Sequence, residues 1–379
     1  MKLVVAGMIA FLLKLLLAGS TMGSNDARTW EYDLTTLHTA GFAELYRWGV
    51  QYDVDYDSPS GRLSQRQAFI HPPAVLHALR ILGNRFWLRA TCALADAGTL
   101  ALLWRMFGSV PLLVALAPIS ILISGFHGNT DPIMMFFLVA SVFFANRGKA
   151  SLAGLAFGLS CSVKLVPLIF GPAILLCLPG LRPRVQWMAS GIGIWVAVSL
   201  PYLAQEPALI LKSMLGYGGA TGLWGFSLVL SPLYDSVIKW TALLAASLLP
   251  LMRKRQLFEQ CGLIAFLFLF LAPGFGLQYL AWTVPWTMGL PRRWMIGYHC
   301  IAAAFALSVY AAASQNTSAG IYADLLNPSH FAVLILMGIV CWITIGASMA
   351  ILWVIEIRLY QPGLAIVKVS QQLLIARSV

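Results

Sequence analysis

The polar stretch that follows the first apolar segment of the chain is Gly23-Ser24-Asn25-Asp26-Ala27-Arg28-Thr29-Trp30-Glu31. Residues 3–18, which precede it, are apolar except for Lys14. A membrane helix over these residues would leave Asp26 at the membrane surface, about two helical turns beyond the hydrocarbon core. A carboxylate is unusual in that position. We therefore expect the later helices to build a wall and a cavity around this stretch, and we expect the stretch to carry the chemistry.

The composition is typical of a polytopic helical membrane protein. Hydrophobic residues make up 59% of the 379 residues, charged residues make up 10%, and the mean hydropathy is +0.79. A soluble surface could not accommodate so many apolar side chains. The net charge is +11, but the basic residues form small clusters between apolar segments, as topology signals do. The cysteines lie in apolar stretches at no metal-site spacing, so neither disulfides nor zinc are predicted.

Hydropathy predicts an all-α protein with about twelve membrane segments. Several are shorter than the roughly 20 residues that a straight span needs, so some helices are expected to be tilted or broken. The segments are residues 2–19, 83–106, 109–125, 131–145, 150–164, 167–180, 186–203, 232–251, 257–273, 279–291, 295–313 and 331–356.

The basic clusters orient these segments. With cytoplasmic N- and C-termini, every cluster falls on the cytoplasmic side; the clusters are Arg147 with Lys149, Arg182 with Arg184, Arg253-Lys254-Arg255, and Arg292-Arg293. The long connections 20–82, 204–231 and 314–330 then face the periplasm or cell exterior, which predicts an exterior working face. The first segment could instead be a cleaved signal peptide, but Lys14 interrupts it, and the even number of spans requires that it be retained.

We predict one integral-membrane domain over residues 1–379. A first exterior loop at residues 20–82 carries the acid, core helices occupy residues 83–290, and C-terminal helices occupy residues 291–379. Within the loop, residues 34–48 and 74–82 are amphipathic and predict helices lying along the membrane surface. The run Asp53-Val54-Asp55-Tyr56-Asp57 resembles a cation-binding segment, although a solvated turn is the favoured interpretation.

Other polar residues mark the ends of apolar segments. His71 precedes two prolines that suit the first turn of a helix, and it either faces the cavity or has a structural role. Asp96 lies deep in a predicted span, where we favour a helix-packing role. Helix capping would explain Asn129, Thr130 and Asp131, but not His127. Lys164 ends its segment away from the basic clusters, so it is either a snorkelling lysine or a receptor for a phosphate.

Two aromatic stretches lie on the same predicted face. Residues 216–225 are rich in glycine and include Tyr217 and Trp224, but they lack the lysine of a nucleotide-binding loop. Residues 273–282 place the Gln278 amide beside Tyr279. Aromatic rings of this kind pack against sugar rings and prenyl chains.

The motifs in chain order resemble the integral-membrane GT-C glycosyltransferases, most of all the bacterial mannosyltransferases that depend on polyprenyl-phosphate mannose. The resemblance spans about residues 20–290, and the last two helices carry no recognised motif. The motifs are Asn25-Asp26, His71-Pro72-Pro73, His127-Gly128-Asn129-Thr130-Asp131, Lys164 followed by Pro167, and Gly276-Leu277-Gln278-Tyr279-Leu280-Ala281-Trp282 with Pro285.

The resemblance implies inverting transfer of mannose or another hexose from a polyprenyl-phosphate donor to a lipid-linked or glycan acceptor. It implies that an acid of the first exterior loop is the catalytic base; Asp26 matches that position and Glu31 is the alternative. No paired Asp-x-Asp motif accompanies Asp26, which favours a metal-independent enzyme without cofactor, although a divalent cation remains open. No soluble domain follows the last helix, as it does in some relatives.

The chemistry fits the residue types. A carboxylate can take the proton of an attacking hydroxyl, and Lys164 with His127 can stabilise the phosphate leaving group. His71 is a further catalytic or acceptor-site candidate. The candidate substrate-binding residues are Asn129, Asp131, Tyr217, Trp224, Gln278 and Tyr279.

Two other classes of protein remain. A twelve-helix transporter or lipid flippase would show two similar halves, and we find no internal repeat. A structural or assembly protein would leave Asp26, Lys164 and Gln278 without a role.

Overall fold

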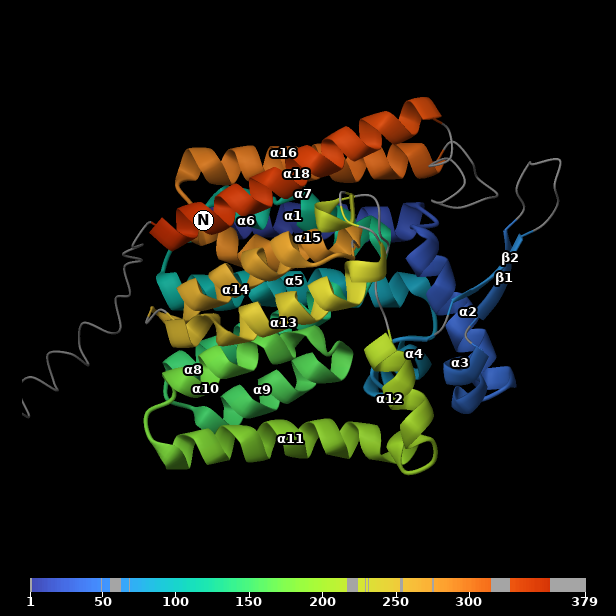
Figure 1. The fold of residues 1–379 in the computed structure, drawn as a ribbon, viewed down its shortest axis with the longest axis horizontal. Helices are drawn as coiled ribbons and strands as arrows, with labels where there is room; N and C mark the ends of the chain where they lie inside the picture. The colour runs from blue at the N-terminus through green and yellow to red at the C-terminus, as the bar shows by residue number, and fades with distance from the viewer. Residues whose placement is uncertain are drawn as a thin grey trace, which may run out of the picture.

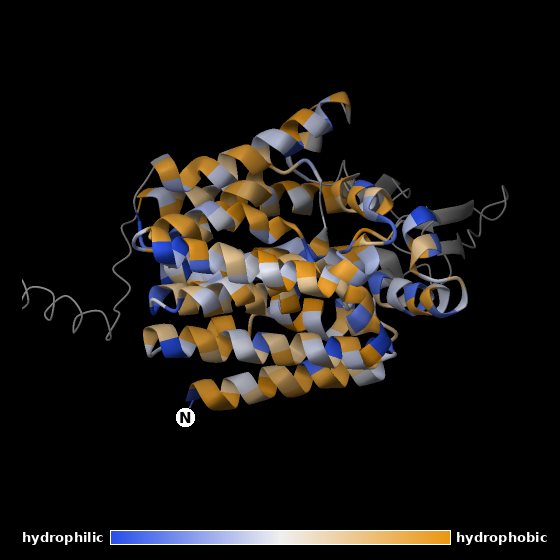
Figure 2. Cartoon of the chain, turned by 90° about the horizontal axis from the view of Figure 1, so that it is seen from below, coloured by the Kyte–Doolittle hydropathy of each residue, from blue (hydrophilic) through white to orange (hydrophobic). Residues whose placement is uncertain are grey.

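The computed structural model describes all residues except 1, 49, 55–62, 68, 217–223, 229, 231, 253–254, 275, 315–327 and 355–379. Its body is a bundle of long helices that run side by side (Figure 1). Apolar residues follow these helices along their length, whereas hydrophilic residues gather toward the helix ends (Figure 2). The long helices are α1 (Lys2–Ser20), α5 (Arg85–Phe107), α8 (Asp131–Asn146), α9 (Ala150–Val163), α11 (Leu181–Leu203), α13 (Asp235–Met252), α14 (Leu257–Leu271), α16 (Arg292–Ser314) and α18 (Pro328–Val354).

Three described helical stretches are long and apolar enough to cross a membrane alone: Lys2–Ser20, Arg85–Phe107 and Ala332–Val354. A fourth span results if α11 and the following helix α12 (Pro207–Gly216) are counted together, although they are bent by 117°. Several other apolar helices are 10–17 residues long. These helices support a membrane protein, while the number of about twelve spans stays a prediction.

Three of the predicted segments are not continuous α-helices. Pro111, Pro118, Pro167 and Pro285 lie at the start of short pieces, where proline lacks the backbone donor that helix continuation needs. The predicted segments at 109–125, 167–180 and 279–291 are therefore broken, in line with the expectation that some short segments are tilted or broken. The pieces are α6 (Leu112–Ala115), α7 (Pro118–Ile121), the π-helix η1 (Leu122–His127), the 3-10 helix η2 (Val166–Phe170), α10 (Gly171–Cys177), η5 (Leu277–Tyr279), α15 (Leu280–Thr283) and η6 (Val284–Gly289).

Several shorter elements gather at one end of the bundle, opposite the end where α1 begins (Figure 1). They include α2 (Asn25–Thr39), α3 (Phe42–Trp48), the strands β1 (Val50–Val54) and β2 (Leu63–Gln67), and α4 (Ala74–Leu82). The strands form an antiparallel hairpin in which Val50 pairs with Gln67, so the prediction of an all-α chain is wrong for this pair. The turns η3 (Gly225–Leu228) and η4 (Pro232–Tyr234) complete the described elements.

The amphipathic pattern of the first loop produces a small core of its own. Leu37, Leu45 and Leu76 are each at most 3% exposed and belong to one hydrophobic cluster with Trp30 and Phe69. Helix α4 has the predicted bounds, whereas the stretch predicted at 34–48 breaks at Gly41, where φ is +84°. Residues before this break extend α2 back to Asn25. The acidic stretch that opened the loop is thus the start of a helix.

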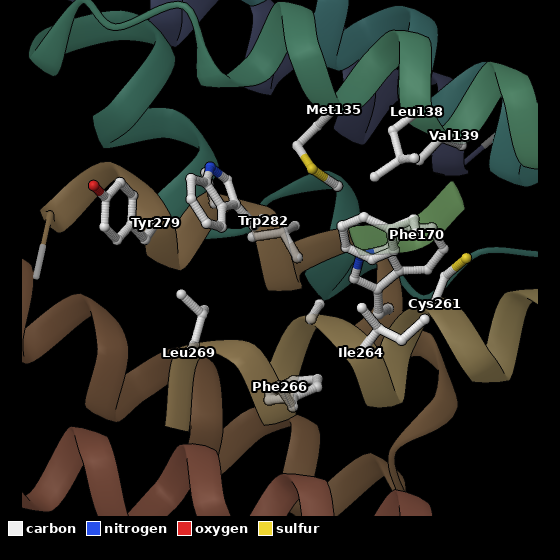
Figure 3. Close-up of a cluster of buried hydrophobic side chains, with 14 of the residues drawn as sticks. Met135, Leu138, Val139, Phe170, Cys261, Ile264, Phe266, Leu269, Tyr279 and Trp282 are labelled. Carbon is white, nitrogen blue, oxygen red and sulfur yellow. The ribbon is translucent and has the colours of Figure 1, made fainter. Parts of the chain in front are cut away.

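The main core lies between the long helices. Figure 3 shows Met135, Leu138 and Val139 of α8 across from Cys261 and Ile264 of α14, with these side chains filling the space between the two helices. These side chains belong to the main hydrophobic core of the described residues.

Small residues let α9 and α11 approach closely. A Cβ at Gly154 would lie 2.2 Å from the backbone oxygen of Trp187, and one at Gly158 would lie 2.3 Å from that of Gly191. Close backbone contact through small residues is how membrane helices pack in the absence of a hydrophobic driving force between them.

A buried ion pair ties α1 into the bundle. The Nζ atom of Lys14 lies 2.6 Å from Oδ2 of Asp96 on α5 and donates to the Ser120 hydroxyl at 2.8 Å. The Ser120 and Ser124 hydroxyls also donate to Asp96. The predicted helix-packing role of Asp96 is confirmed. This pair also explains Lys14 within an apolar segment, because a retained first helix supplies the partner of Asp96.

Candidate functional site

The first turn of α2 is bound to the segment that links η1 to α8. The Ser24 hydroxyl donates to the backbone oxygen of His127 at 2.7 Å, and the Trp30 indole donates to that of Gly128 at 2.7 Å. The Asn129 side-chain amide donates to Oδ2 of Asp26 at 2.5 Å. Two polar stretches far apart in the sequence therefore meet, and Asp26 is fixed where they meet.

Backbone conformation makes this approach possible. Gly128 has φ +78°, and a Cβ there would lie 3.0 Å from that of Ala27.

The guanidinium of Arg89, which is 1% exposed, donates to the backbone oxygens of Ala18 at 2.6 Å and Thr21 at 2.9 Å. Arg89 thus satisfies carbonyl groups at the end of α1, where the helix leaves acceptors without partners, and fixes the connection leading to Asp26.

Asp26 faces a cavity of about 530 Å³ at the end of the bundle where α2 lies (Figure 1). Helices α2, α12 and α13, the segment after α9, and residues 268–282 all contribute to its wall. Its polar side includes most residues predicted from the sequence, and its remaining wall is largely apolar. The polar residues are Asp26, Asp33, His71, His127, Asn129, Lys164, Lys239, Gln278 and Tyr279.

Asp26 is an ionised carboxylate. Its side chain is 28% exposed, and its Oδ2 lies 3.1 Å from Nε2 of His127. Burial alone would raise the pKa of Asp26, but the charge and hydrogen bond of His127, the Asn129 amide and the Lys164 charge outweigh burial and lower the pKa to about 2. Asp26 is therefore negative over the whole physiological pH range and can accept a proton.

Lys164 is paired rather than isolated. Its Nζ atom lies 2.6 Å from Oδ2 of Asp131, which is fully buried, and the Trp282 indole donates to the other oxygen of Asp131. The side chain of Lys164 is 14% exposed and lines the cavity. The snorkelling interpretation is therefore wrong for this residue, because its ammonium group turns to a buried carboxylate. The capping interpretation is also wrong here. Asn129 bonds Asp26, Asp131 bonds Lys164 and Trp282, and Thr130, the N-cap of α8, makes no side-chain cap bond.

His71 is a neutral imidazole that packs against aromatic rings in the cavity wall. Its ring centre lies 4.7 Å from that of Trp30, and its backbone oxygen accepts a hydrogen bond from Tyr46 at 2.6 Å. Burial, followed by the charge of Lys164, lowers the pKa of His71 to about 3. His71 is therefore uncharged at physiological pH. Its packing against Trp30 and the hydrogen bond from Tyr46 to its backbone favour a positioning role.

Not every predicted residue reaches the cavity. Glu31 lies outside its lining and pairs with Arg85 at 3.1 Å. Trp224 is fully buried, stacks on Phe305, and is absent from the lining. Tyr217 lies outside the described residues. Gln278 and Tyr279 line the cavity as expected.

Asp33 is the cavity residue that sequence reasoning missed. It lies seven residues after Asp26 on α2, and it is 3% exposed. Seven residues are two helical turns, so the two carboxyl groups share one helix face. That spacing was the signal available in the sequence. Within the described part of the chain, no group of three or more His, Cys, Asp or Glu side chains could hold a metal ion.

The fold and site together define a helical membrane protein with an ionised carboxylate and a lysine facing a cavity at one end of the bundle, an arrangement suited to group transfer. Residues 123–200 match the family model of mannosyltransferase (PIG-M), a GT-C-type membrane mannosyltransferase family. The match confirms the resemblance to GT-C glycosyltransferases and supports membrane mannosyltransferase activity. It covers His127, Asn129, Asp131 and Lys164. No curated protein matches the chain.

Proposed function

We propose that this protein is an inverting glycosyltransferase that moves mannose or another hexose from a polyprenyl-phosphate donor to a lipid-linked or glycan acceptor. The observation that carries the proposal is the ionised carboxylate of Asp26, fixed by Asn129 and facing the same cavity as Lys164. The reaction takes place on the exterior face of the membrane, and the protein is multi-pass with cytoplasmic termini. The position of α2 opposite the start of α1 supports this topology (Figure 1).

The donor headgroup binds at the polar side of the cavity. A phosphate placed between Lys164 and His127 would receive charge-assisted hydrogen bonds from the lysine and a donor from the imidazole. These two residues supply positive charge without a divalent cation, so we propose a metal-independent reaction.

The prenyl chain occupies the apolar wall and leaves toward the bilayer. Leu168, Leu215 and Trp240 line the cavity and are 54%, 55% and 57% exposed. They come from η2, α12 and α13, and in a membrane their exposed surface faces lipid. A cavity that is polar at one end and opens through apolar side chains suits a lipid-linked phosphate, because the tail can stay in the bilayer while the headgroup reaches Asp26.

The transfer is a single displacement. The acceptor hydroxyl oxygen forms a bond to the anomeric carbon while the bond from that carbon to the phosphate oxygen breaks, and attack from the opposite face inverts the configuration. The hydroxyl proton passes to Asp26, and the electron pair of the broken bond leaves with the prenyl phosphate. Lys164 and His127 stabilise the charge that develops on this leaving group.

Donor binding makes Asp26 a stronger base. In the empty cavity, the positive groups around Asp26 hold its pKa at about 2. A bound phosphate adds negative charge beside the same groups and therefore raises the pKa of the carboxylate. Asp26 is thus a stronger base in the complex with the donor, where the proton transfer takes place.

Aromatic and amide groups complete the sugar site. The rings of Tyr279 and Trp282 lie 4.3 Å apart, and Tyr279 lines the cavity next to Gln278. An aromatic face packs against the apolar face of a hexose, and an amide can bond its hydroxyls.

Transport or lipid flipping is the second candidate function, because helices broken beside a cavity are common in transporters. Purified protein in lipid nanodiscs, supplied with a prenyl-phosphate mannose, distinguishes the two. The transferase account predicts release of prenyl phosphate and a new glycosidic bond of inverted configuration by NMR. Movement of the intact lipid between leaflets, with no cleavage of the donor, would support the second function and contradict the first.

A further inference from the structure

A second acid shares the cavity with Asp26 and has no part in the displacement. Asp33 lines the cavity wall on the same helix, about 10 Å further along α2 by the rise of two helical turns. Asp33 is only 3% exposed, and its Oδ1 atom has no hydrogen-bond partner among the described residues.

Such a group needs a partner. A buried carboxyl oxygen without a hydrogen bond is costly to a folded protein. Among the described residues the Oδ1 atom of Asp33 has no partner, and the nearby Tyr46 hydroxyl donates to the backbone of His71. Since Asp33 opens onto the cavity, a bound molecule can supply the missing donors.

The walls beside Asp33 indicate what kind of molecule this is. Trp30, Phe69 and His71 line the same part of the cavity, and their rings pack against one another at centroid distances of 4.7 to 6.4 Å. Aromatic faces next to a carboxyl suit a ring that is apolar on its faces and carries hydroxyls at its edge. This part of the cavity is formed by α2 and residues 69–71, and Met214 of α12 belongs to the same hydrophobic cluster as Trp30 and Phe69.

We propose that Asp33 binds the acceptor, and that the acceptor is a glycoside whose neighbouring hydroxyls donate to the Asp33 carboxyl while another hydroxyl lies at Asp26. The inference rests on the proposed function. Asp33 then sets which acceptor is used and how it is oriented, and Asp26 carries out the proton transfer.

The protonation of Asp33 should make acceptor binding depend on pH. Burial, followed by the negative charge of Asp26, raises the pKa of Asp33 to about 8. The other titratable groups at this cavity are His71, His127, Lys164, Lys239 and Tyr279, with Tyr46 close to Asp33. Hydroxyl donors favour the ionised form, so acceptor binding should strengthen as the pH rises toward 8.

The test measures transfer from a short-chain prenyl-phosphate mannose to octyl α-mannoside, together with hydrolysis of the donor when no acceptor is added. Asp33→Leu should raise the KM for octyl α-mannoside roughly 10- to 100-fold, because it removes two hydrogen bonds, and this rise should exceed any change in the KM for the donor. Glu44→Gln, an exposed acid on α3, is the matched control and should behave as the wild type.

Asp33→Asn keeps the size of the neutral acid but cannot ionise. Its acceptor KM should match the wild type near pH 6 and should exceed it increasingly up to pH 8.5. An unchanged acceptor KM in Asp33→Leu overturns the inference; if that variant does not fold, an unchanged pH dependence in Asp33→Asn overturns it. A wild type that hydrolyses the donor but never glycosylates octyl α-mannoside contradicts the acceptor class, whereas a wild type that neither hydrolyses nor transfers contradicts the proposed function itself.

Discussion

Neutralising both members of the Lys164–Asp131 pair separates the structural role of Lys164 from its role in donor binding. Asp131 is fully buried, and Lys164 Nζ lies 2.6 Å from it. Lys164→Met leaves a buried carboxylate with only the Trp282 indole as partner, which should cost about 3–5 kcal/mol of unfolding free energy. Asp131→Asn should cost less, because the Lys164 ammonium can still reach the cavity. The double variant removes both charges and should be more stable than the sum of the single effects by at least about 2 kcal/mol.

Donor affinity is then measured on the folded double variant, by competition with a fluorescent prenyl phosphate in detergent micelles. Loss of a charge-assisted contact to phosphate should weaken binding roughly 10- to 100-fold, from about 1.5–3 kcal/mol. The matched control is Lys14→Met with Asp96→Asn, which neutralises the other buried pair. That control should lose stability but retain donor affinity. Normal donor affinity in the Lys164→Met/Asp131→Asn variant would refute phosphate binding by Lys164.

Three further predictions concern the site and its orientation. The apparent melting temperature of Asp33→Asn should rise above that of the wild type as the pH increases from about 4 to 8, because the folded protein holds the Asp33 proton that the unfolded chain releases; parallel pH dependences would contradict the raised pKa. Gly128→Ala should lose about 1–2 kcal/mol of stability, since alanine is strained at φ +78°. The control Gly148→Ala, also at positive φ but with nothing within 4 Å of the added Cβ, should lose a similar amount of stability and keep full transfer activity. Equal transfer activity in both variants would contradict the importance of the contact between α2 and residues 127–129. In intact cells, a cysteine replacing the exposed Thr35 should react with an impermeant thiol reagent and one replacing the exposed Ser151 should not; the reverse pattern would place the cavity on the cytoplasmic side.

The sequence was sufficient to predict which polar residues meet. Asp26, His127 and Lys164 each end or follow an apolar segment on the same predicted side of the membrane, and alternation of the segments brings such ends together. This reasoning needs only hydropathy and the placement of basic clusters. It predicted a cavity built around Asp26 without any knowledge of side-chain contacts.

The partners of these residues could not be predicted in the same way. The sequence pattern indicated no partner for Lys164, because Asp131 is 33 residues away in the chain. The contact between Lys164 and Asp131, at the start of α8, depends on how α8 and α9 pack. Lys14 and Asp96 are 82 residues apart and were each considered alone. Pairing across helices depends on rotation about the helix axis, which a hydropathy profile does not report.

Other differences have local causes. Apolar composition predicts a membrane segment at 109–125, 167–180 and 279–291, but prolines divide each into short pieces. Asp33 was overlooked because an acid in an amphipathic helix is normally solvated, whereas tertiary packing buries this one.

The measurement that tests the account most directly is sugar transfer by Asp26→Asn. Asparagine keeps the size of the side chain and an oxygen that can accept from Asn129, but it cannot take a proton. The variant should fold and bind the donor, while its turnover should fall by about 10² to 10⁴. Glu31→Gln alters an acid that pairs with Arg85 outside the cavity lining, and this variant should transfer sugar at the wild-type rate. Near-normal transfer by Asp26→Asn would contradict the assignment of Asp26 as the base, and with it the mechanism proposed for this cavity.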